Sequence, residues 1–358
     1  MVSPKSLFGS KQQPLLGIDI SASSLKLVEL SGARDGKITV ERVAIERLEK
    51  GWFNEGNIDN FDEVAEAMRR LVKKSGSKTK QAAFALPSSA VITRKIVLPA
   101  GLSEEELEIQ VESEASHYIP FSLDEVSLDF CVIGPSKNSS DDVEILIAAS
   151  RKDKVQDRQG LAEAAGLTAV VLDIESFAAH LAVNQIAKAW PKTAEAPLVA
   201  LIEIGANSSS LLVTQGDEAL FEREQSFGGS QLTQSIARHY GISAEEAENK
   251  KRAGELPDDY ASVLLRPYIS NITQEIVRAL QLFYTSSQFN AVDRILLAGG
   301  GSSVAGLAAS VTQATETACQ VVSPFEGLEV AGSVRMRNAS KEAPSYLTAF
   351  GLALRRFD

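Results

Sequence analysis

The sequence has few cysteines and few histidines. Cys131 and Cys319 are the only cysteines, and they lie far apart without CxxC spacing, so the sequence predicts neither a disulfide framework nor a zinc site. His117, His180 and His239 share no metal-ligand spacing, and we expect structural roles for them. This cysteine usage is typical of a reducing cytosol.

Long apolar runs and an excess of positive charge are also lacking. No stretch approaches the roughly 18 apolar residues of a spanning helix, and apolar runs such as residues 198–204 have the length of a strand. Residues 1–14 contain lysines but no long apolar stretch, so we expect a flexible segment rather than a secretory signal. A net charge of -11 argues against nucleic acid as a partner.

The composition that is present is that of a globular protein. Hydrophobic residues make up 44% and charged residues 23% of the 358 residues, which excludes disordered, collagen-like and membrane-bundle proteins. This length exceeds the usual size of one domain, so we expect two lobes or several subdomains.

Hydrophobic periodicity in the first half predicts strands followed by helices. Residues 15–30 alternate as in a hairpin of two half-buried strands, and residues 37–44 continue it as a third strand. Apolar residues then recur at helical spacing from Phe61 to Val72, and Gly76 ends that segment. The order of strands and helices favours an α/β fold.

From Gln81 the pattern changes to a strand that ends near Pro99. A helix follows, opened by Ser103 with Glu106 at capping-box spacing. Strands at 126–133 and 143–149 and a helix at 152–165 complete a block that reads as an inserted subdomain.

The second half begins after a helix at 175–189 and a segment rich in proline and small polar residues. Ser243 with Glu246 predicts the start of another helix, residues 268–289 predict a long one, and residues 294–298 predict a buried strand.

An internal repeat links the two halves. IDISASS at 18–24 aligns without gaps on IEIGANS at 202–208, so that Asp19 matches Glu203, and the match continues further along each second strand. Each lobe is therefore expected to start with the same hairpin, a carboxylate-bearing strand that enters a turn of small residues.

Such turns suit a phosphate chain, because small residues let backbone N–H groups and hydroxyls approach it closely. Ser21, Ser23 and Ser24 meet this need, Asp19 could hold Mg²⁺ through its waters, and Lys26 could reach the phosphates. A single hairpin of this kind is more often only structural, but its duplication favours a nucleotide site.

A third element is the strand and turn at residues 296–307, which contains Gly299, Gly300 and Gly301. Glycines there let a ligand approach the backbone, and the following helix N-terminus favours negative charge. Val304 occupies the last glycine position of a Rossmann fingerprint, and no Walker A motif is present.

The segments GIDISASSLKL, LIEIGANSSSLLV and LLAGGGSSVAGL occur in the order of the two phosphate motifs and the adenosine motif of the actin, DnaK-type chaperone and sugar kinase superfamily. Within it the chain resembles, over nearly its full length, the PilM family of type IV pilus assembly proteins, relatives of the division protein FtsA. The segments SFGGSQLTQSIARHYGISAEEAE and GLALRRFD are similar to PilM sequences, and we expect no amphipathic tail like that of FtsA, which favours PilM.

The resemblance implies an α/β, two-lobed actin-like ATPase fold, built from duplicated ribonuclease H-like domains with an FtsA/PilM-type inserted subdomain. The expected divisions are a flexible segment at 1–14, a first lobe at 15–195 with the insert at about 81–166, a second lobe at 196–335, and a C-terminal helix at 336–358 that returns to the first lobe.

It also implies ATP or ADP with Mg²⁺ between the lobes. Asp19 would lie by the metal, and the remaining implied nucleotide-binding residues are Ser21, Ser23, Ser24, Lys26, Gly205, Ala206, Asn207, Ser208, Gly228, Gly229, Ser230, Glu248, Lys251, Gly299, Gly300 and Gly301. The second phosphate motif usually carries Asp, so Glu203 leaves hydrolysis open. Glu175 lies near the place where such ATPases position water, or only caps its helix.

The implied function is that of a cytoplasmic, ATP-binding component of the inner-membrane pilus assembly complex, with the N-terminal cytoplasmic segment of PilN as its partner. Other pilus components are further expected partners, and membrane association would come through them. Residues 118–121, Tyr-Ile-Pro-Phe, are a candidate for the PilN groove, with core packing as the alternative. A small-molecule kinase and a filament-forming ATPase remain alternative functions, and at most slow ATP hydrolysis is expected.

Overall fold

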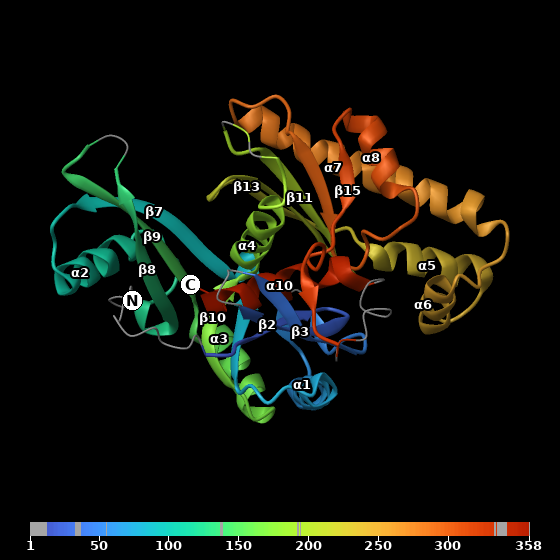
Figure 1. Cartoon of the computed structure of the whole chain (residues 1–358), viewed down its shortest axis with the longest axis horizontal. Helices are drawn as coiled ribbons and strands as arrows, with labels where there is room; N and C mark the ends of the chain where they lie inside the picture. Colours follow the sequence, from blue (N-terminus) through green and yellow to red (C-terminus); the bar gives the residue numbers. More distant parts are fainter. Residues whose placement is uncertain are drawn as a thin grey trace.

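The computed structural model describes residues 13–32, 37–54, 56–136, 139–191, 193, 195–332, 334 and 342–357. Most of the segment predicted to be flexible, residues 1–12, lies outside these ranges. Two lobes with one sheet each lie side by side, and a smaller subdomain projects from the first lobe (Figure 1). None of the helices in the described ranges is long and apolar enough to span a bilayer.

The first lobe contains a six-stranded sheet in the order β10-β6-β1-β2-β3-β16. Its strands are β1 (Leu16–Ser21), β2 (Ser24–Gly32), β3 (Ile38–Arg47), β6 (Gln81–Leu86), β10 (Thr168–Ile174) and β16 (Glu329–Val330). Helices α1 (Phe61–Ser75) and α3 (Lys152–Ala164) bury Met68, Leu71 and Leu161 against one face of this sheet. Helix α1 ends at Gly76 in the left-handed conformation, as the sequence predicts. The short strands β4 (Phe53–Asn54) and β5 (Asn57–Ile58) form a separate hairpin.

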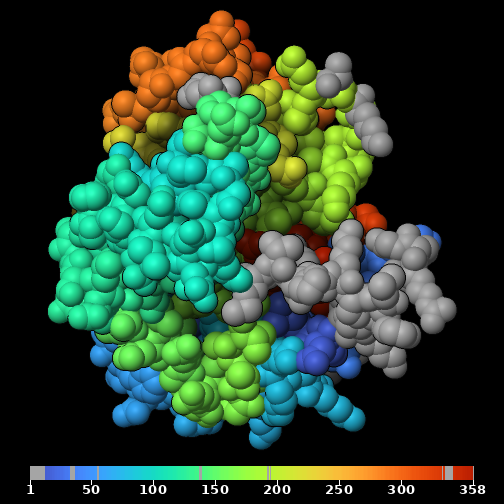
Figure 2. Space-filling view, turned by 90° about the vertical axis from the view of Figure 1, so that its left-hand side faces the viewer, coloured from blue at the N-terminus to red at the C-terminus, as the bar shows by residue number. Residues whose placement is uncertain are grey.

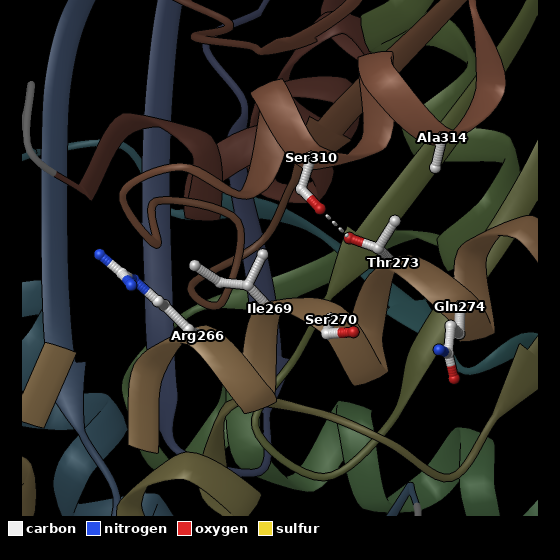
Figure 3. A pocket seen from close by; sticks show the side chains of 7 residues that line it. All are labelled: Arg266, Ile269, Ser270, Thr273, Gln274, Ser310 and Ala314. Atoms are coloured by element: carbon white, nitrogen blue, oxygen red, sulfur yellow. Dashed lines mark hydrogen bonds between the residues drawn. The ribbon is translucent and has the colours of Figure 1, made fainter. Parts of the chain in front are cut away.

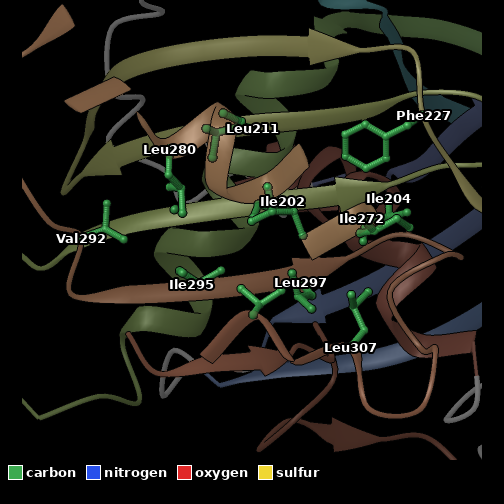
Figure 4. Close-up of a cluster of buried hydrophobic side chains, with 14 of the residues drawn as sticks. Ile202, Ile204, Leu211, Phe227, Ile272, Leu280, Val292, Ile295, Leu297 and Leu307 are labelled. Carbon is green, nitrogen blue, oxygen red and sulfur yellow. The ribbon is translucent and has the colours of Figure 1, made fainter. Parts of the chain in front are cut away.

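The second lobe contains a five-stranded sheet in the order β13-β12-β11-β14-β15. Its strands are β11 (Leu198–Ile204), β12 (Ser209–Gln215), β13 (Glu218–Gln225), β14 (Arg294–Ala298) and β15 (Cys319–Val321). Its helices are α5 (Gly229–Tyr240), α6 (Ala244–Ala253), α7 (Arg266–Ser286), which a π-helical turn (Ala261–Leu265) precedes, and α8 (Leu307–Thr315). Ile202, Ile272 and Leu297 form part of the apolar core between this sheet and its helices (Figure 4). Because β11 and β14 are apolar on both faces, they pack on helices from either side.

The two sheets repeat one topology. Strands β10-β6-β1-β2-β3 of the first lobe follow the same order and directions as β15-β14-β11-β12-β13 of the second, with parallel pairs at one end and antiparallel hairpins at the other. Strands β1 and β11 occupy equivalent places, as the sequence repeat predicts. This arrangement confirms the two-lobed fold with duplicated domains.

Helices α4 (Glu175–Ala187) and α10 (Leu347–Leu354) lie in the core that joins the two sheets. Val28 of the first sheet, Leu201 of the second and Phe350 of α10 belong to one buried cluster. Helix α10 approaches its neighbours so closely that a Cβ atom on Gly351 would lie 1.8 Å from the carbonyl oxygen of Ala178. The short turns Ala343–Tyr346 and Arg355–Phe357 flank this helix.

The inserted subdomain is a three-stranded antiparallel sheet in the order β7-β9-β8, with helix α2 on one face. It comprises β7 (Val91–Pro99), α2 (Glu104–Ala115), β8 (Val126–Pro135) and β9 (Asp142–Arg151), with short 3-10 turns at Ser88–Ala90 and Leu123–Glu125. Ser103 and Glu106 form the predicted capping box of α2.

The observed subdomain is shorter than the expected span of about 81–166. The stretch expected as one strand ending near Pro99 is two strands in different sheets, since the 3-10 turn after Pro87 turns the chain out of the main sheet after β6. Helix α3 packs into the core of the first lobe rather than onto the three-stranded sheet. Periodicity alone cannot show these boundaries of the subdomain, because the apolar pattern of a strand or helix is the same whichever sheet the strand joins or the helix packs on.

Candidate functional site

The first hairpin places Asp19 directly opposite Lys26, on β1 and β2. Lys26 Nζ lies 2.7 Å from Asp19 Oδ2 and donates a second hydrogen bond of 3.0 Å to Ser21 Oγ. Only 7% of Asp19 and 6% of Lys26 is exposed. The residue predicted to hold the metal and the one predicted to reach the phosphates therefore form a buried ion pair.

The turn of this hairpin is tight and anchored. Ser21 Oγ donates to the carbonyl oxygen of Ser24 at 2.9 Å, and the backbone N–H of Leu48 donates to the carbonyl of Ser23 at 3.0 Å. The three serines proposed for phosphate binding are thus held together at one end of the sheet. Their spacing follows from the register, in which Ser21 opposes Ser24.

The second hairpin turns through Gly205, whose N–H donates to the carbonyl of Ser208 at 2.9 Å. The start of helix α5 is fixed against this turn, because Gly229 N–H donates to Gly205 O at 2.9 Å and Ser230 Oγ donates to Asn207 Oδ1 at 2.7 Å. The N–H groups of Gly229, Ser230 and Gln231 all donate to carbonyl oxygens of the protein, so this end of α5 offers an anion the partial positive charge of the helix. The two predicted groups of residues, 205–208 and 228–230, therefore form one surface.

Gly228 permits this contact. A Cβ atom there would lie 2.5 Å from the carbonyl oxygen of Ala206 and 2.7 Å from that of Gly205. Any other residue would push the start of α5 away from the turn.

The glycine-rich turn after β14 borders the same hairpin, because β11 and β14 are parallel and Glu203 lies opposite Ala298. Gly301 N–H donates to the carbonyl of Ile204 at 2.8 Å. Gly299 has φ +82°, and a Cβ atom there would lie 2.5 Å from Ile204 O. The second phosphate motif and the adenosine motif of the sequence thus lie next to one another.

Three carboxyl groups interact between the lobes. Burial, and then repulsion from Asp19 and Glu203, raises the pKa of Glu175 to about 8, and the positive charge of Arg158 opposes this. Burial, and then repulsion from Asp19, raises the pKa of Glu203 to about 7, although Thr348 Oγ1 donates to it at 3.3 Å. Strands β1 and β11 and the start of α4 therefore bring acidic groups into one region, where a cation would be stabilised.

This region fits Mg²⁺ that keeps its waters. Within the described ranges no three Asp, Glu, His or Cys side chains form a direct metal-binding group. Mg²⁺ needs only one or two carboxylates in addition to water and phosphate oxygens. Asp19 can supply such a contact once Lys26 turns away from it.

Glu248 and Lys251 contact helix α5. Glu248 Oε2 accepts hydrogen bonds of 2.5 Å from both Thr233 Oγ1 and Lys251 Nζ. Burial alone would raise the pKa of Glu248, but the hydrogen bonds from Lys251 and Thr233 outweigh it and lower the pKa to about 2. The carboxylate is therefore charged at neutral pH, and Arg252 Nε also donates to it at 2.6 Å.

Arg252 continues this network to the other lobe, a contact that the sequence analysis missed. Its guanidinium lies 3.3 Å from Glu342 Oε1, and the same carboxylate is paired with Arg47 of β3. Arg47 opposes Ser24 in the first hairpin. Burial, and then the positive charge of Arg252, lowers the pKa of Arg47. Two arginines from different lobes thus share one carboxylate beside the predicted site.

The candidate groove residues divide into two groups. Ile119 is buried in the core of the inserted subdomain, whereas Tyr118 is 44% and Phe121 39% exposed. The guanidinium carbon of Arg94 lies 4.7 Å from the Tyr118 ring centroid, and that of Arg151 lies 5.7 Å from the Phe121 ring centroid. These aromatic rings lie where α2 ends, close to the junction with the first lobe.

A surface pocket between α7 and α8 is separate from these motifs. It is lined by Arg266, Ile269, Ser270, Thr273, Gln274, Ser310 and Ala314, and Thr273 and Ser310 share a hydrogen bond of 2.9 Å across it (Figure 3). A second pocket borders the turn that follows Gly301 and includes Ser303, Gly306 and Pro344. Only the second one adjoins the predicted adenosine motif.

Solved structures share this architecture. The chain is similar to ethanolamine utilization protein EutJ from Carboxydothermus hydrogenoformans, with 16% identity, a TM-score of 0.57, and 95% of this chain and 88% of that chain covered. It is also similar to MreB5 of Spiroplasma citri bound to ADP, with 11% identity, a TM-score of 0.50, and coverage of 95% and 94%. Together with the duplicated sheets, these similarities define an actin-like ATPase fold.

A narrower relationship is shown by the sequence. The family model described as type IV pilus assembly protein PilM matches residues 17–357. A structure of a PilM-PilN type IV pilus biogenesis complex is 30% identical, with a TM-score of 0.78, and the match covers 96% of this chain and 98% of that one. The chain belongs to the PilM family, which confirms the resemblance found in the sequence.

Proposed function

We propose that the protein binds ATP or ADP with Mg²⁺ between its lobes and, in that state, docks the N-terminal cytoplasmic segment of a PilN partner. The observation that carries this proposal is the pair of equivalent hairpins, with Asp19 on one and Glu203 on the other in electrostatic contact. In this role the protein is a cytoplasmic component of the pilus assembly complex, held at the inner membrane by its partners.

The proposed nucleotide contacts follow the geometry. Ser21, Ser23 and Ser24 on one lobe and residues 205–208 on the other supply N–H groups and hydroxyls for the phosphates. The start of α5, at 228–230, adds the positive end of a helix. The turn of Gly299, Gly300 and Gly301 is proposed to lie under adenosine: Gly299 and Gly301 let it pack on Ile204, and Gly300 leaves open space beside the backbone. Glu248 and Lys251 are proposed to flank the ribose and base.

Lys26 has a double role in this proposal. Without ligand it neutralises Asp19, and with ligand it turns to a phosphate while Asp19 faces a water of Mg²⁺. Bound Mg²⁺ supplies positive charge that neutralises the phosphate oxygens. The exchange keeps every charge paired in both states, so it avoids the cost of a buried lone charge.

Hydrolysis in this site is proposed to be slow. The second phosphate motif of such ATPases usually carries Asp, whereas this chain has Glu203, which is one methylene longer, so its reach toward a metal or an attacking water differs. Burial also raises the pKa of Glu175 and of Glu203, which disfavours their ionised forms until a cation binds beside them. We infer that nucleotide binding, rather than rapid turnover, is the main activity.

The proposed partner surface includes Tyr118 and Phe121. Exposed aromatic rings flanked by arginines are typical anchors of a peptide-binding surface, because they bury large areas at low entropic cost. The PilM-PilN complex among the similar structures supports PilN as the class of partner. Closure of the lobes around nucleotide would favour one arrangement of this surface.

The test is a calorimetric titration of the PilN tail peptide with and without Mg-ATP, using wild-type protein and Asp19→Ala. We expect tighter peptide binding with Mg-ATP, and loss of nucleotide binding in Asp19→Ala. Tyr118→Ala should weaken the peptide by about tenfold, whereas Val263→Ala, at a 46% exposed site on the second lobe, should not. Unchanged nucleotide binding in Asp19→Ala would remove Asp19 from the site.

A further inference from the structure

The inserted subdomain concentrates negative charge and exposed apolar side chains. Residues 88–151 contain twelve acidic and four basic residues, an excess of eight negative charges out of the net -11 of the chain. Of the eleven exposed large apolar side chains in the described residues, six lie here: Val97, Ile109, Tyr118, Phe121, Val132 and Ile133. Tyr118 and Phe121 belong to the proposed PilN surface, but the other four are left without a role.

Three of these four lie near the end of the sheet that is remote from the first lobe, Val97 on one outer strand and Val132 and Ile133 on the other. Val97 of β7 is 53% exposed, and Val132 and Ile133 of β8 are 50% and 48% exposed. Val97 of β7 and Gly134 of β8 both lie opposite Glu144 of the central strand β9. The three apolar residues are therefore at about the same position along the strands, on the two outer strands of the sheet. Figure 2 shows the inserted subdomain, cyan to green, as a block that faces the viewer.

The strand β8 forms an outer edge of this sheet. Among the described residues its only strand partner is β9, and a bulge occurs between Val132 and Gly134. Its ten residues include no Lys or Arg and a single charge, on Asp129. An edge of this length offers backbone N–H and C=O groups to another strand. One of them, the N–H of Phe130, donates to Asp129 Oδ1 at 2.9 Å, a contact that an added strand would replace.

Two other long edges are protected in the usual ways. Strand β7, on the opposite side, has Arg94 and Lys95 and ends in Pro99, and Lys95 Nζ lies 3.8 Å from Glu218 Oε1 of the second lobe. Strand β13 carries four charged residues, Glu218, Glu222, Arg223 and Glu224. Lysine, proline and dense charge each oppose the addition of a strand.

Strand β10, an edge of the sheet of the first lobe, also has a single charge and no Lys or Arg, but Val170 is its one exposed large apolar residue. Strand β8 has two such residues next to each other, Val132 and Ile133, and its own proline, Pro135, lies beyond them at the end of the strand.

We propose that the edge of β8 around Asp129–Ile133 is a second docking surface, which receives an extended, basic segment of a partner protein as a fourth strand. Backbone hydrogen bonds to β8 supply the affinity of such strand addition, and alternate side chains supply its specificity. Val132 and Ile133 favour apolar side chains in the segment, and the net negative charge of the subdomain favours Lys or Arg between them. A second copy of the chain is disfavoured, because it would bring two acidic subdomains together.

The probe is a blocked peptide of about nine residues in which Lys and Val alternate, within the length range of natural strands. It is mixed with the full-length protein and a saturating amount of PilN tail peptide, without nucleotide. We expect it to bind, and to slow backbone hydrogen exchange in β8 by about tenfold or more, while exchange in β7 is unchanged. An analogue in which Glu replaces Lys should not bind.

Matched variants separate strand addition from general charge attraction. Val132→Lys with Ile133→Lys should reduce peptide affinity by about tenfold, whereas Val263→Lys on the second lobe should not. Two further peptides are N-methylated at alternate residues, in opposite phase. The one in which methyl groups replace the N–H groups that face β8 should lose binding. Equal binding of both methylated peptides or of the acidic analogue, or protection of β7, would overturn the proposal. A dimer in sedimentation that the two lysines dissociate would identify a second copy as the occupant instead.

Because neither nucleotide nor the PilN surface is required, this result is independent of the proposed function. Loss of PilN or ATP binding in the titrations described above would leave the peptide result unchanged. Failure of the basic peptide to protect β8 would, in turn, leave the nucleotide proposal untouched.

Discussion

Lys26 Nζ lies 2.7 Å from Asp19 Oδ2 at the start of the first lobe, and both side chains are almost fully buried. The two residues are directly opposite in a hairpin, so the pair is a consequence of strand register. The ammonium group of Lys26 also offsets part of the repulsion between the neighbouring acidic groups of Asp19 and Glu203.

Breaking this pair should therefore destabilise the ligand-free protein. Asp19→Asn leaves the Lys26 ammonium buried without a charged partner, and we expect it to lower the free energy of unfolding by about 3 kcal/mol. The double variant Asp19→Asn with Lys26→Met removes the lone charge and should recover part of this loss. Urea denaturation measures the free energy of unfolding of both variants.

As a control, Arg278→Ala, which removes an exposed pair with Glu275, should change stability by less than about 0.5 kcal/mol. A double variant no more stable than Asp19→Asn would contradict the role of the pair.

The raised pKa values of Glu175 and Glu203 predict how stability changes with pH. In the folded protein the pKa of Glu175 is raised from its ordinary value of 4.5 to about 8, and that of Glu203 to about 7. Between these pH values the folded state binds more protons than the unfolded chain. The contribution of these two groups to stability is therefore greatest at or below pH 4.5, and it is lost as the pH rises toward 8.

Glu175→Gln should remove this pH dependence in part. We expect it to stabilise the ligand-free protein by roughly 2 kcal/mol at high pH, and to have little effect in acid. Thermal unfolding across this pH range is the measurement, with Glu112→Gln on the exposed side of α2 as the control. If Glu175→Gln were destabilising at alkaline pH, the ionised carboxylate would be stabilised by a partner rather than disfavoured by burial.

Two glycines of the site can be distinguished by the same substitution. A Cβ atom on Gly228 would lie 2.5 Å from Ala206 O, whereas one on Gly300 would meet nothing within 4 Å. Gly228→Ala should therefore lower stability by about 2 kcal/mol, because α5 must move away from the second hairpin. Gly300→Ala should leave stability unchanged but weaken nucleotide binding by about tenfold if adenosine lies against this backbone.

Thermal unfolding and equilibrium dialysis with labelled ATP provide the two readings. Normal nucleotide affinity in Gly300→Ala would place adenosine elsewhere. That outcome would not affect the prediction for Gly228, which depends only on contacts within the protein.

Much of the fold could be predicted from the sequence, because it is encoded by local signals. The repeat of 18–24 at 202–208 predicted two equivalent hairpins, and Ser103 and Gly76 predicted helix ends that the structure confirms. The pairing of Asp19 with Lys26 was also within reach, since a two-residue turn fixes which residues face each other.

Other features depend on tertiary contacts that leave no local signal. The span of the inserted subdomain differed because an apolar pattern does not reveal which sheet β6 or α3 joins. Glu342 lies 295 positions from Arg47 and 90 positions from Arg252 in the sequence, and a contact between such distant residues leaves no local pattern. Arg252 alone carried a signal, because it lies four residues after Glu248 on one helix.

This contact between the lobes provides a further prediction about nucleotide release. Arg47 on the first lobe and Arg252 on the second both pair with Glu342, so the carboxylate holds together two elements that must separate for the site to open. Glu342→Gln leaves the two guanidinium groups near each other without a shared anion. We expect nucleotide to dissociate about threefold faster, since half-exposed ion pairs contribute at most about 1 kcal/mol.

The measurement is stopped-flow displacement of a fluorescent ATP analogue at low and high salt. The difference from wild type should shrink at high salt, where such pairs are screened, and Glu275→Gln should behave as wild type. A salt-independent increase in the Glu342 variant would mean that the substitution distorts the site rather than releasing an ionic contact between the lobes.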